Sequence, residues 1–138
     1  MSVFADSEQL YAVAEALFSR VVAENPGAVA QLLRTRMLVR LVCTNPAGEI
    51  WLQARKPPLE THYGHLRLHP ELEVQMAGDT LHEILIGQLT LAPAVARQQI
   101  QVRGQVWKAR ALGDLFEQCQ SIYPHVLRAQ GISTPGAL

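Results

Sequence analysis

Apolar residues in the first part of the chain recur at helical spacing. The positions from Leu10 to Val21 lie three or four residues apart, and Asp6 or Ser7 can cap the start of the helix. The run Asn25-Pro26-Gly27 interrupts this pattern, and a shorter apolar group follows over residues 28–34. The pattern therefore predicts two helices within residues 1–35.

From Arg36 the period changes to two, which is typical of half-buried strands. Two alternating runs, 36–43 and 50–55, flank the turn residues Asn45-Pro46-Ala47-Gly48 and predict a hairpin. Leu66 and Leu68 alternate with polar residues and predict a short third strand. Two further strands are expected at 72–76 and 100–103, the last closed by Gly104.

Helical patterns lie between and after the last two strands. Residues 78–86 and 92–96 predict two short helices separated by Gly87, and residues 106–119 predict a longer one. Pro124 is expected to kink or end the chain's last helix, and Ser133–Gly136 resembles a loose tail. The alternation predicts an α/β fold of the α+β type, with about five mostly antiparallel strands covered on one face by helices.

The segment from Leu81 to Ala96 has more apolar residues than two short packed helices require. The whole chain is 49% hydrophobic and only 17% charged, which is apolar for a domain of 138 residues. On this pattern alone, ordinary core packing is favoured over a cavity, because empty space costs stability. The surplus also fits a surface for a partner protein or a second copy.

The charge balance and the motifs exclude several classes of function. Twelve basic and twelve acidic residues give no net charge, which disfavours nucleic acid and gives no overall basic field toward anionic membranes. His62, His65 and His69 have no metal-binding spacing, and Asp79 with Glu83 is better explained as a helix cap and a first-turn acid than as an acid–base pair. We expect no catalytic residues, no metal and no cofactor, and hence no enzyme.

Neither end of the chain resembles a targeting signal, and no apolar stretch approaches the roughly 20 residues that span a bilayer. Cys43 and Cys119 both fall on apolar faces, which favours buried thiols over a disulfide. We therefore expect a cytoplasmic protein without an integral membrane segment.

The order of elements resembles the sterol carrier protein two family. The similarity rests on Leu72-Glu-Val-Gln-Met-Ala-Gly-Asp79, on Leu81 through Ile86-Gly-Gln-Leu89 and Ala92-Pro-Ala-Val95, and on Ile100-Gln-Val-Arg-Gly104. A helix ending in Leu112-Gly-Asp-Leu-Phe116 completes it, and Gln88 stands where the family more often has lysine. The resemblance covers roughly residues 36–119.

This resemblance implies an apolar tunnel that binds and carries a sterol, a fatty acyl chain or an isoprenoid or quinone-type lipid. It divides the chain into an N-terminal helical extension (1–35), a lipid-binding domain (36–123) and a C-terminal tail (124–138). A charged head group is expected at the mouth, near Gln88 or Arg97, where it would add little to the affinity. The alternative remains a protein-interaction module, including a homodimer. The resemblance implies that these positions line the cavity: Val74, Met76, Leu81, Leu85, Leu89, Val95, Val102, Leu112 and Phe116.

Overall fold

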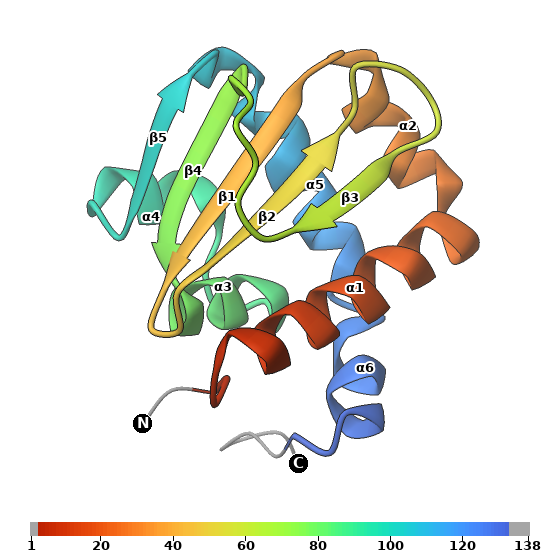
Figure 1. Ribbon diagram of the computed structural model, residues 1–138, viewed down its shortest axis with the longest axis vertical. Coiled ribbons are helices and arrows are strands. Elements are labelled where there is room, and N and C mark those ends of the chain that lie inside the picture. The colour runs from red at the N-terminus through yellow and green to blue at the C-terminus, as the bar shows by residue number, and fades with distance from the viewer. Residues whose placement is uncertain (1–2, 133–138) are drawn as a thin grey trace.

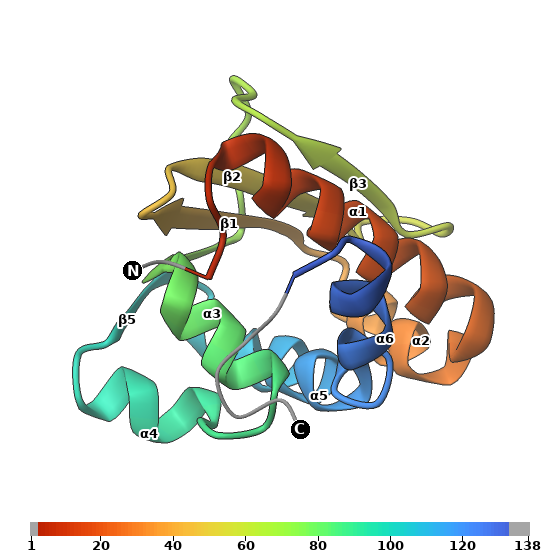
Figure 2. The ribbon, with the colours of Figure 1, turned by 90° about the horizontal axis from the view of Figure 1, so that it is seen from below.

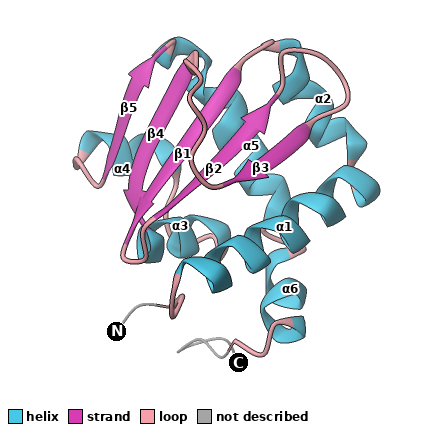
Figure 3. Ribbon diagram, viewed as in Figure 1, coloured by secondary structure: helices cyan, strands magenta, loops and turns pink. Residues whose placement is uncertain are grey.

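A five-stranded sheet with helices packed on one face forms the molecule, in a computed structural model that describes residues 3–132 (Figures 1 and 3). Two helices come first, then the strands, with two short helices inserted before the last strand. The elements in chain order are α1 (Ser7–Glu24), α2 (Pro26–Arg34), β1 (Leu38–Thr44), β2 (Gly48–Gln53), β3 (Glu60–Tyr63), β4 (Leu72–Ala77), α3 (Gly78–Leu85), α4 (Leu91–Ala96), β5 (Ile100–Gly104), η1 (Val106–Lys108), α5 (Ala109–Cys119) and α6 (Tyr123–Ala129).

The sheet is mixed, with strand order β3-β2-β1-β4-β5. β1 and β4 run parallel, and the other three neighbouring pairs are antiparallel, as the alternation predicted. Gly104 ends β5 with a positive φ of 95°, and a Cβ there would lie 2.2 Å from the carbonyl oxygen of Glu71. Glycine is therefore required where β5 leaves β4.

The core lies between the sheet and the helices. Viewed from below, α3, α5 and α6 lie on one side of the sheet, whereas α1 overlaps the strands (Figure 2). Side chains of α1 meet the same face, because they border one void together with Leu41, Ile50 and Leu85. The Asp6 carboxylate caps α1 by accepting the backbone N–H of Gln9, as predicted, and α1 buries the apolar stripe from Leu10 to Val21. That stripe belongs to the same core as the inner sheet residues, so α1 contributes directly to the packing of the sheet.

The other face of the sheet is polar and partly covered. Arg40 bridges Glu49 and Glu73 across three strands, and its guanidinium lies 5.7 Å from the centre of the Trp51 ring. Trp51 is only 1% exposed, because the segment after β3 crosses this face on its way to β4 (Figure 1). The expected third strand at Leu66–His69 is therefore wrong. The strand is Glu60–Tyr63, which pairs with β2, while Leu68 lies in the crossing segment and is 51% exposed.

The end of the chain also differs from the expected tail. Residues 123–129 form α6, in which Tyr123, Val126 and Leu127 are buried. Pro124 lies in the first turn of this helix, where a missing N–H breaks no helical hydrogen bond. The predicted loose tail at Ser133–Gly136 lies outside the described residues, and the three-part division of the chain stays a prediction.

Candidate functional site

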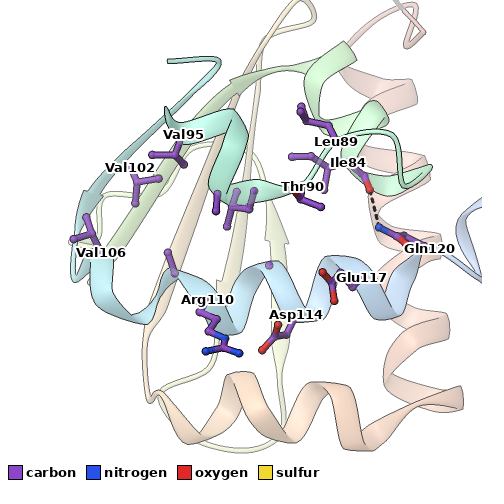
Figure 4. Close-up of a pocket in the computed structure, with 14 residues that line it drawn as sticks. Ile84, Leu89, Thr90, Val95, Val102, Val106, Arg110, Asp114, Glu117 and Gln120 are labelled. Carbon is purple, nitrogen blue, oxygen red and sulfur yellow. Dashed lines mark hydrogen bonds between the residues drawn. The ribbon is translucent and has the colours of Figure 1, made fainter. Parts of the chain in front are cut away.

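A groove of about 860 Å³ lies between α4, β5 and α5 (Figure 4). This volume is within the range of roughly 300–1,000 Å³ that small-molecule sites occupy. Apolar side chains from α3, α4, β5 and the segments between them form most of its wall, and three charged side chains of α5 form one border. The lining residues are Ile84, Leu89, Thr90, Leu91, Ala92, Val95, Val102, Val106, Ala109, Arg110, Gly113, Asp114, Glu117 and Gln120.

The groove exists because α3 ends early and α4 is short. Gly87 adopts a positive φ of 84° directly after α3, which ends that helix and starts the loop to α4. α4 is six residues long and buries only Ala94. On the facing wall of α5, Ala109 and Gly113 present almost no side chain, so the space between α4 and α5 stays open.

One border of the groove is polar. Arg110, Asp114 and Glu117 follow one another at intervals of four and three residues, which places them on one side of α5 (Figure 4). At one end of the groove the Gln120 side-chain amide donates a hydrogen bond of 3.2 Å to the carbonyl oxygen of Ile84. This bond joins the end of α5 to the end of α3. The border offers hydrogen-bond donors and acceptors beside an apolar wall.

The nine residues predicted to line a cavity fall into three groups. Leu89, Val95 and Val102 line the groove, which places these three together. The other six lie in the core, and whether any of the nine binds a ligand stays a prediction. Leu81, Leu85 and Phe116 border a separate void, and Val74, Met76 and Leu112 border neither space.

The separate void measures about 10 Å³, room for roughly one water molecule. It lies among α1, the sheet, α3 and α5, where a tunnel between the sheet and the helices was expected. Leu10, Leu17 and Phe18 of α1 fill this place. In the described residues the large apolar space therefore lies beside α5 and α4, at the β5 edge of the sheet.

The sequence interpretation missed the α5 wall of the groove. Leu91 and Ala92 belong to the apolar surplus recognised at 81–96, but Arg110, Asp114 and Glu117 were not considered. Their spacing beside Ala109 and Gly113 was a usable signal, because it places a polar stripe next to small residues on one helix. Gln88 and Arg97, expected at the mouth, are both exposed and do not line the groove.

Titratable groups in the core are held neutral. Burial raises the pKa of the Cys43 and Cys119 thiols to about 12, so both stay protonated near neutral pH. His82 is buried beside Tyr123, whose hydroxyl lies 2.6 Å from Nδ1, and burial lowers the pKa of this histidine. Within residues 3–132, His, Cys, Asp and Glu side chains form no cluster of three or more that could hold a metal.

The helices of the described chain include none with the length and apolar character needed to cross a membrane. The prediction that Asp79 caps a helix is wrong, because α3 begins at Gly78 without a side-chain cap and Asp79 lies in its first turn. The Asp79 carboxylate instead accepts the backbone N–H of Val3 at 2.8 Å. Of the three clustered histidines, His65 contacts the Glu49 carboxylate at 2.9 Å on the polar face of the sheet. These groups are therefore used in structural contacts outside the groove.

Comparison with models of known families finds no match, and a search of curated proteins finds none either. Solved structures do match. The sterol carrier protein domain 2 of Helicoverpa armigera superposes with a TM-score of 0.64 at 14% identity, over 84% of this chain and 90% of that one.

Two further structures are similar. The palmitated SCP2L2 of Aedes aegypti gives a TM-score of 0.59 at 18% identity, over 84% of this chain and 95% of that one. A UbiJ-SCP2 ubiquinone synthesis protein gives a TM-score of 0.56 at 12% identity, over 78% of this chain and 86% of that one. Together with the mixed sheet and the helices that cover one of its faces, these superpositions show that the chain has the sterol carrier protein two fold.

Proposed function

We propose that this protein binds an apolar ligand in the groove between α4 and α5 and carries it without chemical change. The observation that supports this most directly is an apolar space of about 860 Å³ with a polar border. The similar Aedes aegypti structure is described as palmitated, and another similar structure as a ubiquinone synthesis protein. Fatty acyl, sterol and isoprenoid or quinone-type lipids are the candidate ligands.

Burial of the apolar part supplies most of the binding free energy in this proposal. Each CH₂ removed from water contributes about 0.8 kcal/mol, so affinity should rise by roughly fourfold per added CH₂ until the groove is filled. Leu89, Val95 and Val102 would cover the apolar part, since these side chains lie on the wall opposite the charged residues of α5 (Figure 4).

The polar border favours a neutral head group. It carries one guanidinium, Arg110, and two carboxylates, Asp114 and Glu117. A free carboxylate would meet both repulsion and attraction there. A hydroxyl, ester or quinone oxygen can accept a hydrogen bond from Arg110 without added charge, and a hydroxyl can also donate one to a carboxylate. We therefore propose that a fatty alcohol binds more tightly than the fatty acid of equal chain length.

Displacement of the neutral fluorescent dye Nile red tests both statements. Fatty alcohols of increasing length should displace the dye at progressively lower concentrations, and the matching fatty acids should be weaker competitors. Val102→Ser should weaken every competitor, whereas Val22→Ser on the far surface of α1 serves as the matched control. Affinity that does not depend on chain length, or that Val102→Ser leaves unchanged, would contradict the proposal.

The alternative of a protein-interaction module remains open to a direct test. Val95 and Val106 are exposed at the groove, so a second copy could cover them. Native mass spectrometry after gentle purification separates the two functions: a retained small molecule supports carriage, and a dimer without ligand supports the interaction module. We place the protein in the cytosol, and its two buried, unpaired cysteines support a reducing compartment.

A further inference from the structure

The two tryptophans of this chain have opposite environments. Trp51 is buried under the segment that crosses the polar face of the sheet, whereas Trp107, in η1, is 73% exposed. Its neighbour Val106 is 50% exposed and lines the groove together with Val95 and Val102 (Figure 4). An exposed indole beside exposed aliphatic side chains marks an interaction surface. That surface is continuous with one end of the groove.

Cationic residues lie within η1, on either side of it in the chain and at the neighbouring end of α2. Lys108 ends η1, and its Nζ donates a 3.1 Å hydrogen bond to the carbonyl oxygen of Thr35. This bond brings the end of α2 beside η1, with Arg34 and Arg36, both exposed, on either side of Thr35. The topology thus gathers charges that are about 70 residues apart in the chain.

Two more cations come from the elements that η1 connects. Arg103 lies near the end of β5, four residues before Trp107, and Arg110 lies in the first turn of α5, three residues after it; both are exposed. We call this surface, with Trp107 among its cations, the basic end. Its cations are Arg34, Arg36, Arg103, Lys108 and Arg110.

Carboxylates lie near the basic end without pairing with its cations. Glu73 is opposite Arg103 in the sheet register, but its carboxylate binds Arg40, and Asp114 follows Arg110 by one turn of α5. The backbone of Glu71 accepts the N–H of Gln105, so Glu71 lies close by, but its carboxylate is bound by Arg55 at 2.5 Å. Within the described part of the chain, none of the five cations lies within ion-pair distance of a carboxylate. Since the whole chain has no net charge, the surface away from the basic end carries the balancing negative charge.

We propose that the basic end docks on the surface of an anionic lipid bilayer, with Trp107 at the level of the head groups. Tryptophan is the residue that prefers this level of a membrane, and clustered Lys and Arg are attracted to anionic lipids. Docking in this way places Val106, and with it one end of the groove, against the bilayer. This last point rests on the proposed function, in which an apolar ligand passes between the membrane and the groove.

Other occupants fit the basic end less well. A second copy presenting the same face would bring two sets of like charges together, which opposes association. An acidic protein would satisfy the five cations, but it would leave unexplained why Trp107 and Val106 are exposed where the groove ends. A lipid surface accounts for the charge, the indole and the apolar continuity together.

Vesicle binding followed by tryptophan fluorescence tests the docking. Vesicles of phosphatidylcholine and phosphatidylglycerol in equal parts should shift the emission of the protein to shorter wavelength, and pure phosphatidylcholine vesicles should not. Trp107→Phe should abolish the shift, because the remaining Trp51 is already buried. Arg34→Gln and Arg103→Gln should each weaken binding about fivefold, and high salt should weaken it further. Arg128→Gln on α6 is the matched control and should bind like the parent protein.

Different results would separate the two proposals. Equal binding to both vesicle types, a shift that survives in Trp107→Phe, or affinity unchanged in Arg103→Gln would overturn the docking proposal. Salt-sensitive binding to soluble polyglutamate without vesicle binding would assign the basic end to an acidic protein, and a dimer lost in Trp107→Ala would assign it to a second copy. Nile red binding in solution does not involve Trp107. If the parent protein does not bind Nile red, that result contradicts ligand carriage and leaves the docking proposal standing.

Discussion

Gly113 offers a way to change the groove without weakening the fold. This glycine lies in the interior of α5 and lines the groove opposite Leu91. A Cβ at position 113 would lie 3.4 Å from Cδ2 of Leu91, which is ordinary van der Waals contact. Alanine is therefore accommodated, and a longer side chain must extend into the space that the ligand would occupy.

Alanine and leucine at position 113 should both stabilise the fold, but only leucine should weaken ligand binding. Gly113→Ala should raise the free energy of unfolding by about 0.5–1 kcal/mol, because glycine in a helix interior costs that much relative to alanine. This corresponds to a rise in Tm of about 3 °C for a chain of this size. Gly113→Leu should keep most of that gain and weaken ligand binding by about tenfold or more, since overfilling a packed site costs about 1–3 kcal/mol.

Thermal melts and Nile red titration measure the two effects side by side. Gly27→Leu on α2 is the matched control, because its Cβ would meet only the Asn25 side chain at 3.7 Å and lies away from the groove. It should change Tm without changing dye affinity. If Gly113→Leu is folded and binds the dye as tightly as the parent protein, the groove is not the binding site.

Three further predictions concern the core. Leu85→Gln should lower the free energy of unfolding in urea by about 2–5 kcal/mol, because Leu85 is buried and the added amide would be buried with it. A smaller loss would show that the space beside Leu85 exceeds the void of about 10 Å³. Burial lowers the pKa of His82 in the folded state. Neutral His82 should therefore contribute to the free energy of unfolding above its unfolded pKa of about 6.5. This contribution should be lost as the pH falls through the lower folded pKa. Tyr123→Phe should lower the free energy of unfolding by about 1–3 kcal/mol, because it leaves the His82 ring without its partner. The Tm of His82→Gln should change less between pH 5 and 7.5 than the Tm of the parent protein. Cys43 and Cys119, with pKa values raised to about 12, should react with iodoacetamide at pH 8 only after denaturation, as mass spectrometry can show; rapid labelling of folded protein would contradict their burial.

Local patterns in the sequence were sufficient for most of the secondary structure. The alternation from Leu72 to Met76 and from Ile100 to Val102 identified β4 and β5, because a half-buried strand has a period of two. The same rule failed at Leu66 and Leu68. Alternation there reflects a segment that crosses the polar face of the sheet, and a pattern of apolar positions does not distinguish a strand from such a crossing.

The candidate site was only partly predictable for a related reason. Helical spacing identified Leu85, Phe116 and Val95 as residues on apolar faces, and the resemblance placed all three at one cavity. Periodicity indicates that a face avoids water, but it does not say whether the face meets another side chain or an open space. α1 decides this, because its apolar stripe fills the region above β1 and β2 and leaves open space only where the short α4 meets α5.

The sequence by itself determined most of the elements, their apolar faces and the absence of net charge, because each depends on neighbours in the chain or on composition. Only the tertiary structure decided where the groove lies and that the end of α2, with Arg34, lies beside η1, which carries the exposed Trp107. The charges of the whole chain sum to zero, but a membrane or a partner protein contacts only one face of the molecule. The hydrogen bond from Lys108 to Thr35 joins residues 73 positions apart, and no local pattern encodes that contact.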